Sequence, residues 1–171
     1  MWVFGYGSLM WKPGFDYLDA CHARLNGYHR SLCVYSWVHR GTEERPGLVF
    51  GLDRGGACKG FAFRIAPEQE SDVLAYLDAR ELVTDVYRRK WLTIATEHGR
   101  VPAWCYVVRR DHPQYAGRLP EADLVPMIEN GRGRSGHCRD YVLSTVAHLE
   151  ELGVEDAVLK SVANKLLANA A

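Results

Sequence analysis

Hydrophobic residues recur along this chain with two periods, which distinguish predicted strands from predicted helices. Bulky, strand-favouring residues begin at Trp2 and predict a short buried strand, and residues 31–35 form a second extended run. Two hairpins are expected after it. Residues 47–52 and 60–65 flank the turn sequence Asp53-Arg54-Gly55-Gly56, and residues 87–96 and 101–108 flank His98-Gly99.

Spacings of three and four between apolar residues predict the helices. A central helix is expected to open at Pro67 and to bury Val73 and Leu77. Its early acidic residues, Glu68, Glu70 and Asp72, suit the positive end of the helix dipole. A short helix is expected over residues 119–129. Two more, separated at Gly153, are expected to bury Val142, Thr145, Val146 and Leu149, and then Leu159, Val162, Ala163 and Leu166.

These elements together favour an α+β fold, because strands concentrate in hairpins and helices gather toward the C-terminal end. The sheet is expected to be antiparallel and barrel-like. The 171 residues contain no internal repeat or linker, so residues 1–171 are expected to form a single domain.

The composition narrows the classes of function. Because 21 basic residues balance 21 acidic ones, the chain lacks the basic footprint of a nucleic-acid-binding protein. No apolar stretch approaches the roughly 20 residues of a membrane helix, and the start does not resemble a signal peptide, so a cytoplasmic protein is expected. The five cysteines are scattered without a CxxC pair, which argues against a disulfide framework or a zinc site. We expect no metal, no cofactor and no obligatory protein partner.

The glycine-rich segment after the first strand is a candidate binding loop. Gly5 and Gly7 allow backbone conformations, including positive φ, that other residues resist. Such a loop can direct N–H groups at a carboxylate or an oxyanion, and Ser8 adds a hydroxyl. An ordinary glycine turn is the alternative. The segment is not a dinucleotide-binding fingerprint, because Met10 stands where the third glycine belongs, and the GxGxxG match at residues 131–136 follows a helical pattern instead of a strand.

One carboxylate falls in line with the apolar face of the central helix. A step of four residues from Leu77 leads to Glu81, where an unpaired charge is costly and the pKa tends to rise. Two alternatives stay open. Arg80 or another cation pairs with Glu81, or the helix ends earlier and leaves Glu81 exposed in a loop.

Several separate motifs resemble those of the ChaC-type γ-glutamylcyclotransferases. In order, they are Phe4-Gly5-Tyr6-Gly7-Ser8-Leu9 with Met10-Trp11, His39-Arg40-Gly41-Thr42, Arg45-Pro46-Gly47-Leu48-Val49, Tyr76-Leu77 with Arg80-Glu81, His112-Pro113-Gln114-Tyr115-Ala116-Gly117, and Tyr141. The resemblance runs from Trp2 to about Leu159. It implies a γ-glutamylcyclotransferase-like fold, a small and mainly antiparallel β-barrel surrounded by helices, and an enzyme that converts glutathione to 5-oxoproline and cysteinylglycine.

The same resemblance implies roles for particular residues. Glu81 matches the catalytic glutamate, and Tyr141 matches a tyrosine near the substrate. The γ-glutamyl group would be held by Val3, Phe4, Gly5, Tyr6, Gly7 and Ser8. One position departs from the pattern, since Cys138 stands where many relatives have asparagine.

The chemistry of the reaction agrees with these roles. The substrate's own α-amine must attack its γ-carbonyl, yet an α-amine with a pKa of about 8 is mostly protonated near neutral pH. A desolvated Glu81 can take this proton and pass it to the departing amine. Because the attack is intramolecular, holding the glutamyl chain folded supplies part of the acceleration.

Two other classes of function stay open. An amide or peptide hydrolase would use Ser8 or a cysteine as nucleophile with one of the seven histidines, although Ser8 lies in no GxSxG elbow. A non-catalytic ligand-binding module would use the glycine loop as a cradle and Glu81 as a structural residue. Release of 5-oxoproline from glutathione distinguishes the first interpretation from both.

Overall fold

The computed structural model describes residues 1–169, so the last two residues of the predicted domain lie outside it. The chain forms two compact units. The first contains Met1–Ser31 and Gly51–Pro113, and the second contains Leu32–Phe50 and the chain from Gln114 onward. Within the described residues, no helix has both the length and the apolar character needed to cross a membrane.

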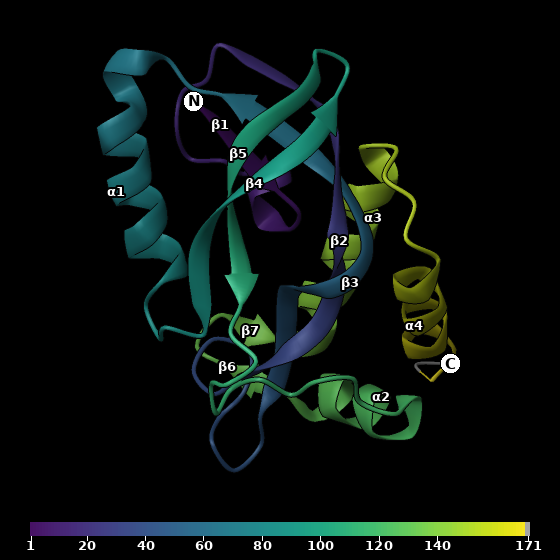
Figure 1. The fold of residues 1–171 in the computed structure, drawn as a ribbon. Helices are drawn as coiled ribbons and strands as arrows, with labels where there is room; N and C mark the ends of the chain where they lie inside the picture. The colour runs from purple at the N-terminus through teal and green to yellow at the C-terminus, as the bar shows by residue number, and fades with distance from the viewer. Residues whose placement is uncertain (170–171) are drawn as a thin grey trace. The chain divides into compact units, whose positions relative to one another are not determined.

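Five strands close into a barrel in the order β1-β3-β2-β4-β5 (Figure 1). Their bounds are β1 (Trp2–Gly5), β2 (Asp19–Ser36), β3 (Gly47–Arg64), β4 (Tyr87–Thr96) and β5 (Gly99–Val108). β1 pairs antiparallel with β3 and parallel with β5, whereas β2 and β4, and β4 and β5, pair antiparallel. The predicted α+β fold with a mainly antiparallel barrel is therefore confirmed.

The second predicted hairpin is present, and its two strands pair from Tyr87 opposite Val108 to Thr96 opposite Gly99. Burial alternates along β4, because Ile94 is buried while Trp91 on the other face is 47% exposed.

The first predicted hairpin is wrong, because β3 continues without reversal from Gly47 to Arg64. Gly55 and Gly56 do have positive φ values, of 105° and 65°, but these conformations occur within a continuous strand. The extent of β2 is also corrected. The strand begins at Asp19, well before the predicted residues 31–35. Its early part alternates buried and exposed residues, but their types only weakly favour strands, so the sequence pattern did not predict it.

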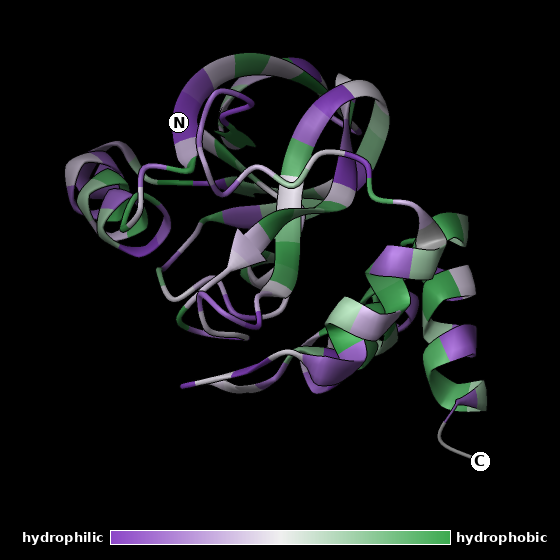
Figure 2. Ribbon diagram, turned by 90° about the horizontal axis from the view of Figure 1, so that it is seen from below, coloured by the Kyte–Doolittle hydropathy of each residue, from purple (hydrophilic) through white to green (hydrophobic). Residues whose placement is uncertain are grey.

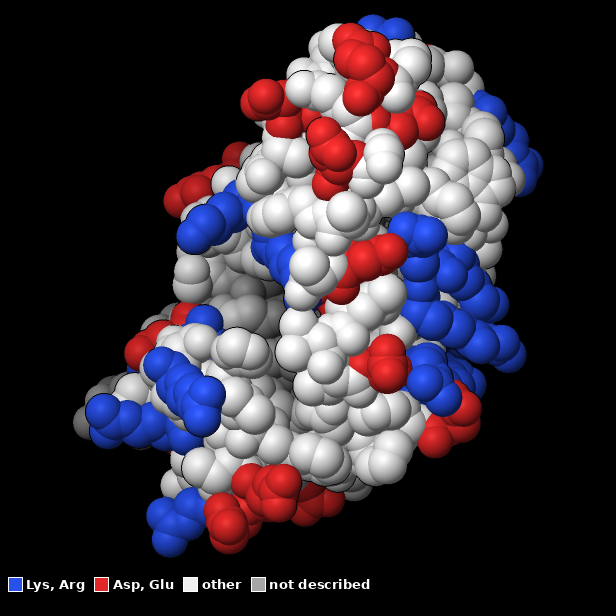
Figure 3. Space-filling view, turned by 90° about the vertical axis from the view of Figure 1, so that its left-hand side faces the viewer, with Lys and Arg blue, Asp and Glu red and all other residues white. Residues whose placement is uncertain are grey.

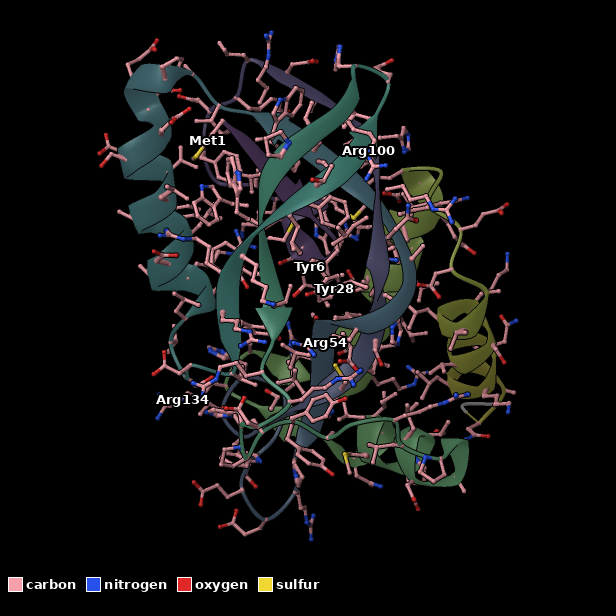
Figure 4. All side chains as sticks on the ribbon, viewed as in Figure 1. Met1, Tyr6, Tyr28, Arg54, Arg100 and Arg134 are labelled. Atoms are coloured by element: carbon pink, nitrogen blue, oxygen red, sulfur yellow. The ribbon has the colours of Figure 1, made fainter. Side chains whose placement is uncertain are left out.

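The predicted central helix is α1 (Glu70–Glu81), preceded by the short turn η2 (Pro67–Gln69). Val73 and Leu77 are buried and pack in one core cluster with Val3, Phe63 and Tyr106 of the barrel. Acidic side chains gather where α1 begins (Figure 3), and Met1 lies beside this end of the helix (Figure 4). Glu70 pairs there with the amino group of Met1.

The second unit contains α2 (Glu121–Asn130), α3 (Cys138–Glu151) and α4 (Ala157–Ala168). Hydrophobic and polar residues alternate along α3 and α4 (Figure 2), and every residue predicted to be buried there is buried. Gly153 follows α3 with a φ of 66°, which suits its predicted role in ending that helix. The chance GxGxxG match forms the two short strands β6 (Arg132–Gly133) and β7 (Gly136–His137).

Candidate active site

The glycine loop forms a tight turn directly after β1. The strand ends at Gly5, and the short 3₁₀ turn η1 (Ser8–Met10) follows. The N–H of Met10 donates to the carbonyl of Gly7 at 2.9 Å, and the N–H of Lys12 donates to the carbonyl of Ser8 at 2.8 Å. The first N–H groups of a helical turn find no partner within that turn, so this geometry suits a segment that presents donors to a ligand.

Neither glycine of the loop has the positive φ that the sequence allowed for. The two glycines have different reasons to lack a side chain. A Cβ at Gly5 would lie 3.2 Å from both Leu9 Cβ and Phe63 Cε2, which is a tight contact. A Cβ at Gly7 would meet no heavy atom within 4 Å. Gly5 therefore permits close packing, whereas Gly7 borders open space.

A buried arginine supports the loop from within the barrel. Arg30 is 7% exposed, and its Nε donates to the carbonyl of Tyr6 at 2.5 Å. Its Nη2 donates to the carbonyl of Lys59 at 2.7 Å. The guanidinium thus fixes the loop backbone to β3. Sequence reasoning missed Arg30, whose only signal was a charged residue on the buried side of an alternating strand.

A second arginine connects the loop to the central helix. The Nη2 of Arg80 donates to Ser8 Oγ at 2.8 Å, and its Nη1 donates to the carbonyl of Lys12 at 3.0 Å and to that of Pro13 at 3.3 Å. Its Nε lies 3.3 Å from Glu81 Oε1 in a salt bridge. One side chain therefore holds the predicted loop and the predicted catalytic carboxylate together.

Glu81 is the last residue of α1, and its side chain is only 20% exposed. Burial raises the pKa of this carboxyl above its ordinary value, and the positive charge of Arg80 partly offsets the rise. The helix thus persists to Glu81, and a cation also pairs with it. A carboxylate whose pKa is raised accepts a proton more readily than an ordinary glutamate, which suits a general base.

Asp78 anchors the same turn of α1 to the β4–β5 hairpin. The hydroxyl of Tyr106 donates to Asp78 Oδ1 at 2.6 Å, and Arg89 Nη1 lies 2.7 Å from Asp78 Oδ2. Burial and then the bond to Asp78 raise the pKa of the Tyr106 hydroxyl, which therefore stays a donor. The sequence pattern did not identify this anchor, because its partners lie on strands distant in the sequence.

The remaining predicted site residues fall into two groups. Val3 and Phe4 are fully buried, so they can offer a ligand only their backbone. Tyr6 is 7% exposed. Tyr141 lies on α3 in the second unit, where its hydroxyl accepts from the N–H of Phe50 at 3.3 Å. The guanidinium carbon of Arg40 lies 5.0 Å from the centre of its ring. Within the first unit, Arg80 links Ser8 to Glu81, and the role of Tyr141 stays a prediction.

Cys138, the departure from the family pattern, pairs with the backbone of β3. Its Sγ accepts from the N–H of Leu48 at 3.2 Å and donates to the carbonyl of the same residue at 3.1 Å. Burial raises the pKa of this thiol to about 11, so the group is a protonated donor near neutral pH. The thiol therefore satisfies one backbone donor and one backbone acceptor, as a side-chain amide also can.

Comparisons with known proteins agree on one family. A family model described as "ChaC-like protein" matches residues 1–168. The glutathione-specific γ-glutamylcyclotransferase of Escherichia coli is 33% identical over 172 residues, which cover 98% of this chain and 74% of that protein. The human glutathione-specific γ-glutamylcyclotransferase 1 is 35% identical over 158 residues, which cover 90% of this chain and 71% of that protein.

The fold has a close counterpart among solved structures. The crystal structure of a yeast γ-glutamyl cyclotransferase specific to glutathione superimposes with a TM-score of 0.86 and 20% identity. The match covers 98% of this chain and 96% of the yeast chain. The expected γ-glutamylcyclotransferase-like fold is thus confirmed.

Proposed function

Because this chain belongs to the ChaC-like family, we propose that it is a γ-glutamylcyclotransferase that degrades glutathione to 5-oxoproline and cysteinylglycine. The observation that carries the proposal is the Ser8–Arg80–Glu81 connection, which joins a carboxyl of raised pKa to the glycine loop. The names of the curated relatives support the choice of substrate.

In the proposed reaction, the α-amine of the γ-glutamyl group attacks the γ-carbonyl carbon and closes a five-membered lactam. Glu81 takes a proton from the protonated α-amine and gives it to the departing nitrogen of cysteinylglycine as the C–N bond breaks, and the second proton that the attacking nitrogen loses leaves to solvent. No water is consumed, and Glu81 ends in its starting state. Such transfers typically contribute about 10²–10⁴-fold to the rate.

The glycine loop is proposed to bind the γ-glutamyl end of the substrate. The open space beside Gly7 allows the substrate to approach the main chain, where N–H groups can bind the α-carboxylate or the oxyanion. Arg80 fixes both Ser8 and Glu81, so the loop and the base keep one relative geometry. We assign Tyr141 a contact with the substrate as well, on the resemblance alone.

Two wider features follow from the proposal. The match of the family model to both units supports a single working domain, as the sequence predicted. All five cysteines are buried and none forms a disulfide within the described residues, which suits the cytoplasm, where thiols stay reduced. We propose that the catalytic steps need no metal, cofactor, nucleic acid, membrane or protein partner, because a carboxylate and backbone donors suffice.

The test is a product assay on the parent and on Glu81→Gln. Glutathione, γ-glutamylcysteine and γ-glutamylalanine are offered separately, and 5-oxoproline and glutamate are both measured. We expect 5-oxoproline from glutathione, and a loss of at least about 10²-fold in Glu81→Gln, because the amide keeps the size but cannot accept the proton. Glu68→Gln, an exposed acid before the same helix, is the matched control and should retain the parent rate. Glutamate as the product would instead indicate a hydrolase, and the absence of turnover would favour a binding module.

A further inference from the structure

The tip of the β4–β5 hairpin gathers side chains that bind metals. Ala23 of β2 lies opposite Thr96, and Arg24 lies opposite Ala95. Two residues beyond this pairing, Cys21 and His98 lie close to one another at the turn. Figure 4 shows Arg100, which follows this turn, at the far end of the hairpin, well away from Tyr6 of the glycine loop.

The donor atoms at this tip are close to one another. The Sγ of Cys21, a carboxylate oxygen of Glu97 and a ring nitrogen of His98 all lie within 4.8 Å of one another. Asp19 adds a second carboxylate, whose Oδ2 lies 2.9 Å from His98 Nε2. Thiolate, imidazole and carboxylate are the ligands that Zn²⁺ prefers in proteins, at about 2.0–2.3 Å from the metal. Ligands on a tetrahedron of that size lie roughly 3.5 Å apart, so contraction by about 1 Å would bring the donor atoms of Cys21, Glu97 and His98 to ligand spacing.

The backbone of the turn is held in place, while the side chain of Glu97 can move. The Oγ1 of Thr96 accepts from the N–H of His98 at 3.1 Å and donates to the carbonyl of Gly99 at 3.1 Å. The side chain of Glu97 is 72% exposed and free to turn toward the cluster, whereas that of His98 is 49% exposed and is held between the ring of Trp2 and Asp19 Oδ2. Cys21 is 5% exposed and supplies a fixed point.

The electrostatics of the cluster also suit a cation. The Sγ of Cys21 is the buried member of the cluster, and the carboxylates of Asp19 and Glu97 place negative charge beside it. A divalent cation stabilises a thiolate and carboxylates at once, and the thiol proton leaves to solvent when the metal binds.

We propose that this tip is a Zn²⁺ site formed by Cys21, Glu97, His98 and Asp19. The site lies outside the proposed active site and ties the start of β2 to the β4–β5 turn, so its effect is on stability. It departs from the sequence-based expectation of no zinc site, which relied on the absence of a CxxC pair. The ligands instead come from an Asp-x-Cys segment and a Glu-His turn that are distant in the sequence.

The test uses the full chain, stripped of metal and titrated with Co²⁺ as a spectroscopic probe, followed by Zn²⁺ as the competitor. We expect one equivalent of Co²⁺ to give a thiolate-to-cobalt charge-transfer band, which Zn²⁺ removes. Cys21→Ser should abolish the band. His98→Asn should weaken binding by more than the roughly 10–100-fold that loss of an outer-shell partner costs. Cys58→Ser and His29→Asn are the matched controls and should bind as the parent does.

A second readout separates metal binding from loss of fold. Zn²⁺ should raise the temperature of unfolding of the parent and of both controls, but not that of His98→Asn, whose exposed side chain can change without disturbing the core. Circular dichroism checks that this variant is folded. The proposal is overturned if the parent gives no thiolate band, or if Cys21→Ser and His98→Asn bind Co²⁺ as tightly as the parent. Neither readout depends on turnover of glutathione.

Discussion

At the scale of single residues, Arg80 and Glu81 determine how activity should depend on pH. A general base works only when it is deprotonated, so turnover should fall as the pH drops through the pKa of Glu81. Burial raises that pKa, so the acidic limb of the pH–rate profile should lie at a higher pH than an ordinary glutamate would give. Because the charge of Arg80 lowers the same pKa, removing this charge should move the limb to still higher pH.

The matched pair Arg80→Gln and Arg80→Lys tests this coupling. Arg80→Gln removes the charge, so its acidic limb should shift upward. Arg80→Lys keeps the charge but loses the planar fork that reaches both Ser8 and Glu81, so its limb should stay near that of the parent while its kcat falls. The measurement is the pH profile of 5-oxoproline formation. Identical pH profiles for the parent and Arg80→Gln would show that Arg80 does not set the pKa of Glu81.

The glycine loop yields a second pair of variants. In Gly7→Ala the new methyl group enters the open space beside the loop, so the fold should remain intact while the substrate is displaced. A displacement of about 1 Å can cost on the order of 10²-fold in rate. Ser8→Ala should be milder if the hydroxyl only accepts from Arg80, and severe if Ser8 is the nucleophile of a hydrolase. Parent-like glutathione turnover by both variants, with folding checked by circular dichroism, would exclude this loop from the site.

The sequence identified some of these residues and missed others for a physical reason. Glu81 could be found because helical spacing placed it in line with Val73 and Leu77. Arg30 and Asp78 could not, because each acts through partners that the fold, and not the chain order, brings near. Periodicity reports which face a residue occupies, but it carries no information about the group that faces it.

At the scale of elements, the anchor between α1 and the β4–β5 hairpin should stabilise the helix that carries Glu81. Tyr106→Phe removes the hydroxyl that donates to Asp78 and leaves the ring in the core. We expect the free energy of unfolding to fall by about 1.5–3 kcal/mol, as for a hydrogen bond to a charged group. Urea unfolding measures this loss. Tyr28→Phe, which changes a tyrosine outside this anchor in the same way, is the control, and an equal loss in both variants would contradict a specific role for the anchor.

The elements also show where sequence patterns mislead. The β4–β5 hairpin was predicted because two strand-like runs flank the turn sequence His98-Gly99. The same kind of signal failed at Gly55 and Gly56, since positive φ is required by a tight turn but is equally compatible with a strand that continues. The early part of β2 was missed because its buried positions are held by Cys21, Ala23 and Leu25, which are not β-branched or aromatic.

At the scale of the whole molecule, the barrel explains why distant segments contribute to one site. Closure of the barrel places β1 between β3 and β5, so the loop after Gly5 leaves from a strand that is paired along both edges. The core cluster then fixes α1 against Val3 and Phe63. The loop and Glu81 therefore both attach to the same rigid core, which is the requirement for a reaction that relies on positioning.

The buried state of every cysteine leads to the last prediction, which separates the cyclotransferase from a thiol hydrolase. All five thiols are buried, and burial raises the pKa of Cys105 to about 12 and that of Cys138 to about 11. Because the thiolate is the reactive form, alkylation of the folded protein should be slow. Brief treatment with iodoacetamide, removed before glutathione is added because the substrate is itself a thiol, should leave the initial rate unchanged. A chelator should likewise leave the rate unchanged, even where it lowers the unfolding temperature by removing metal from the hairpin tip. A loss of activity that a single cysteine-to-serine variant reproduces, with the fold intact, would indicate a cysteine nucleophile and contradict the role assigned to Glu81.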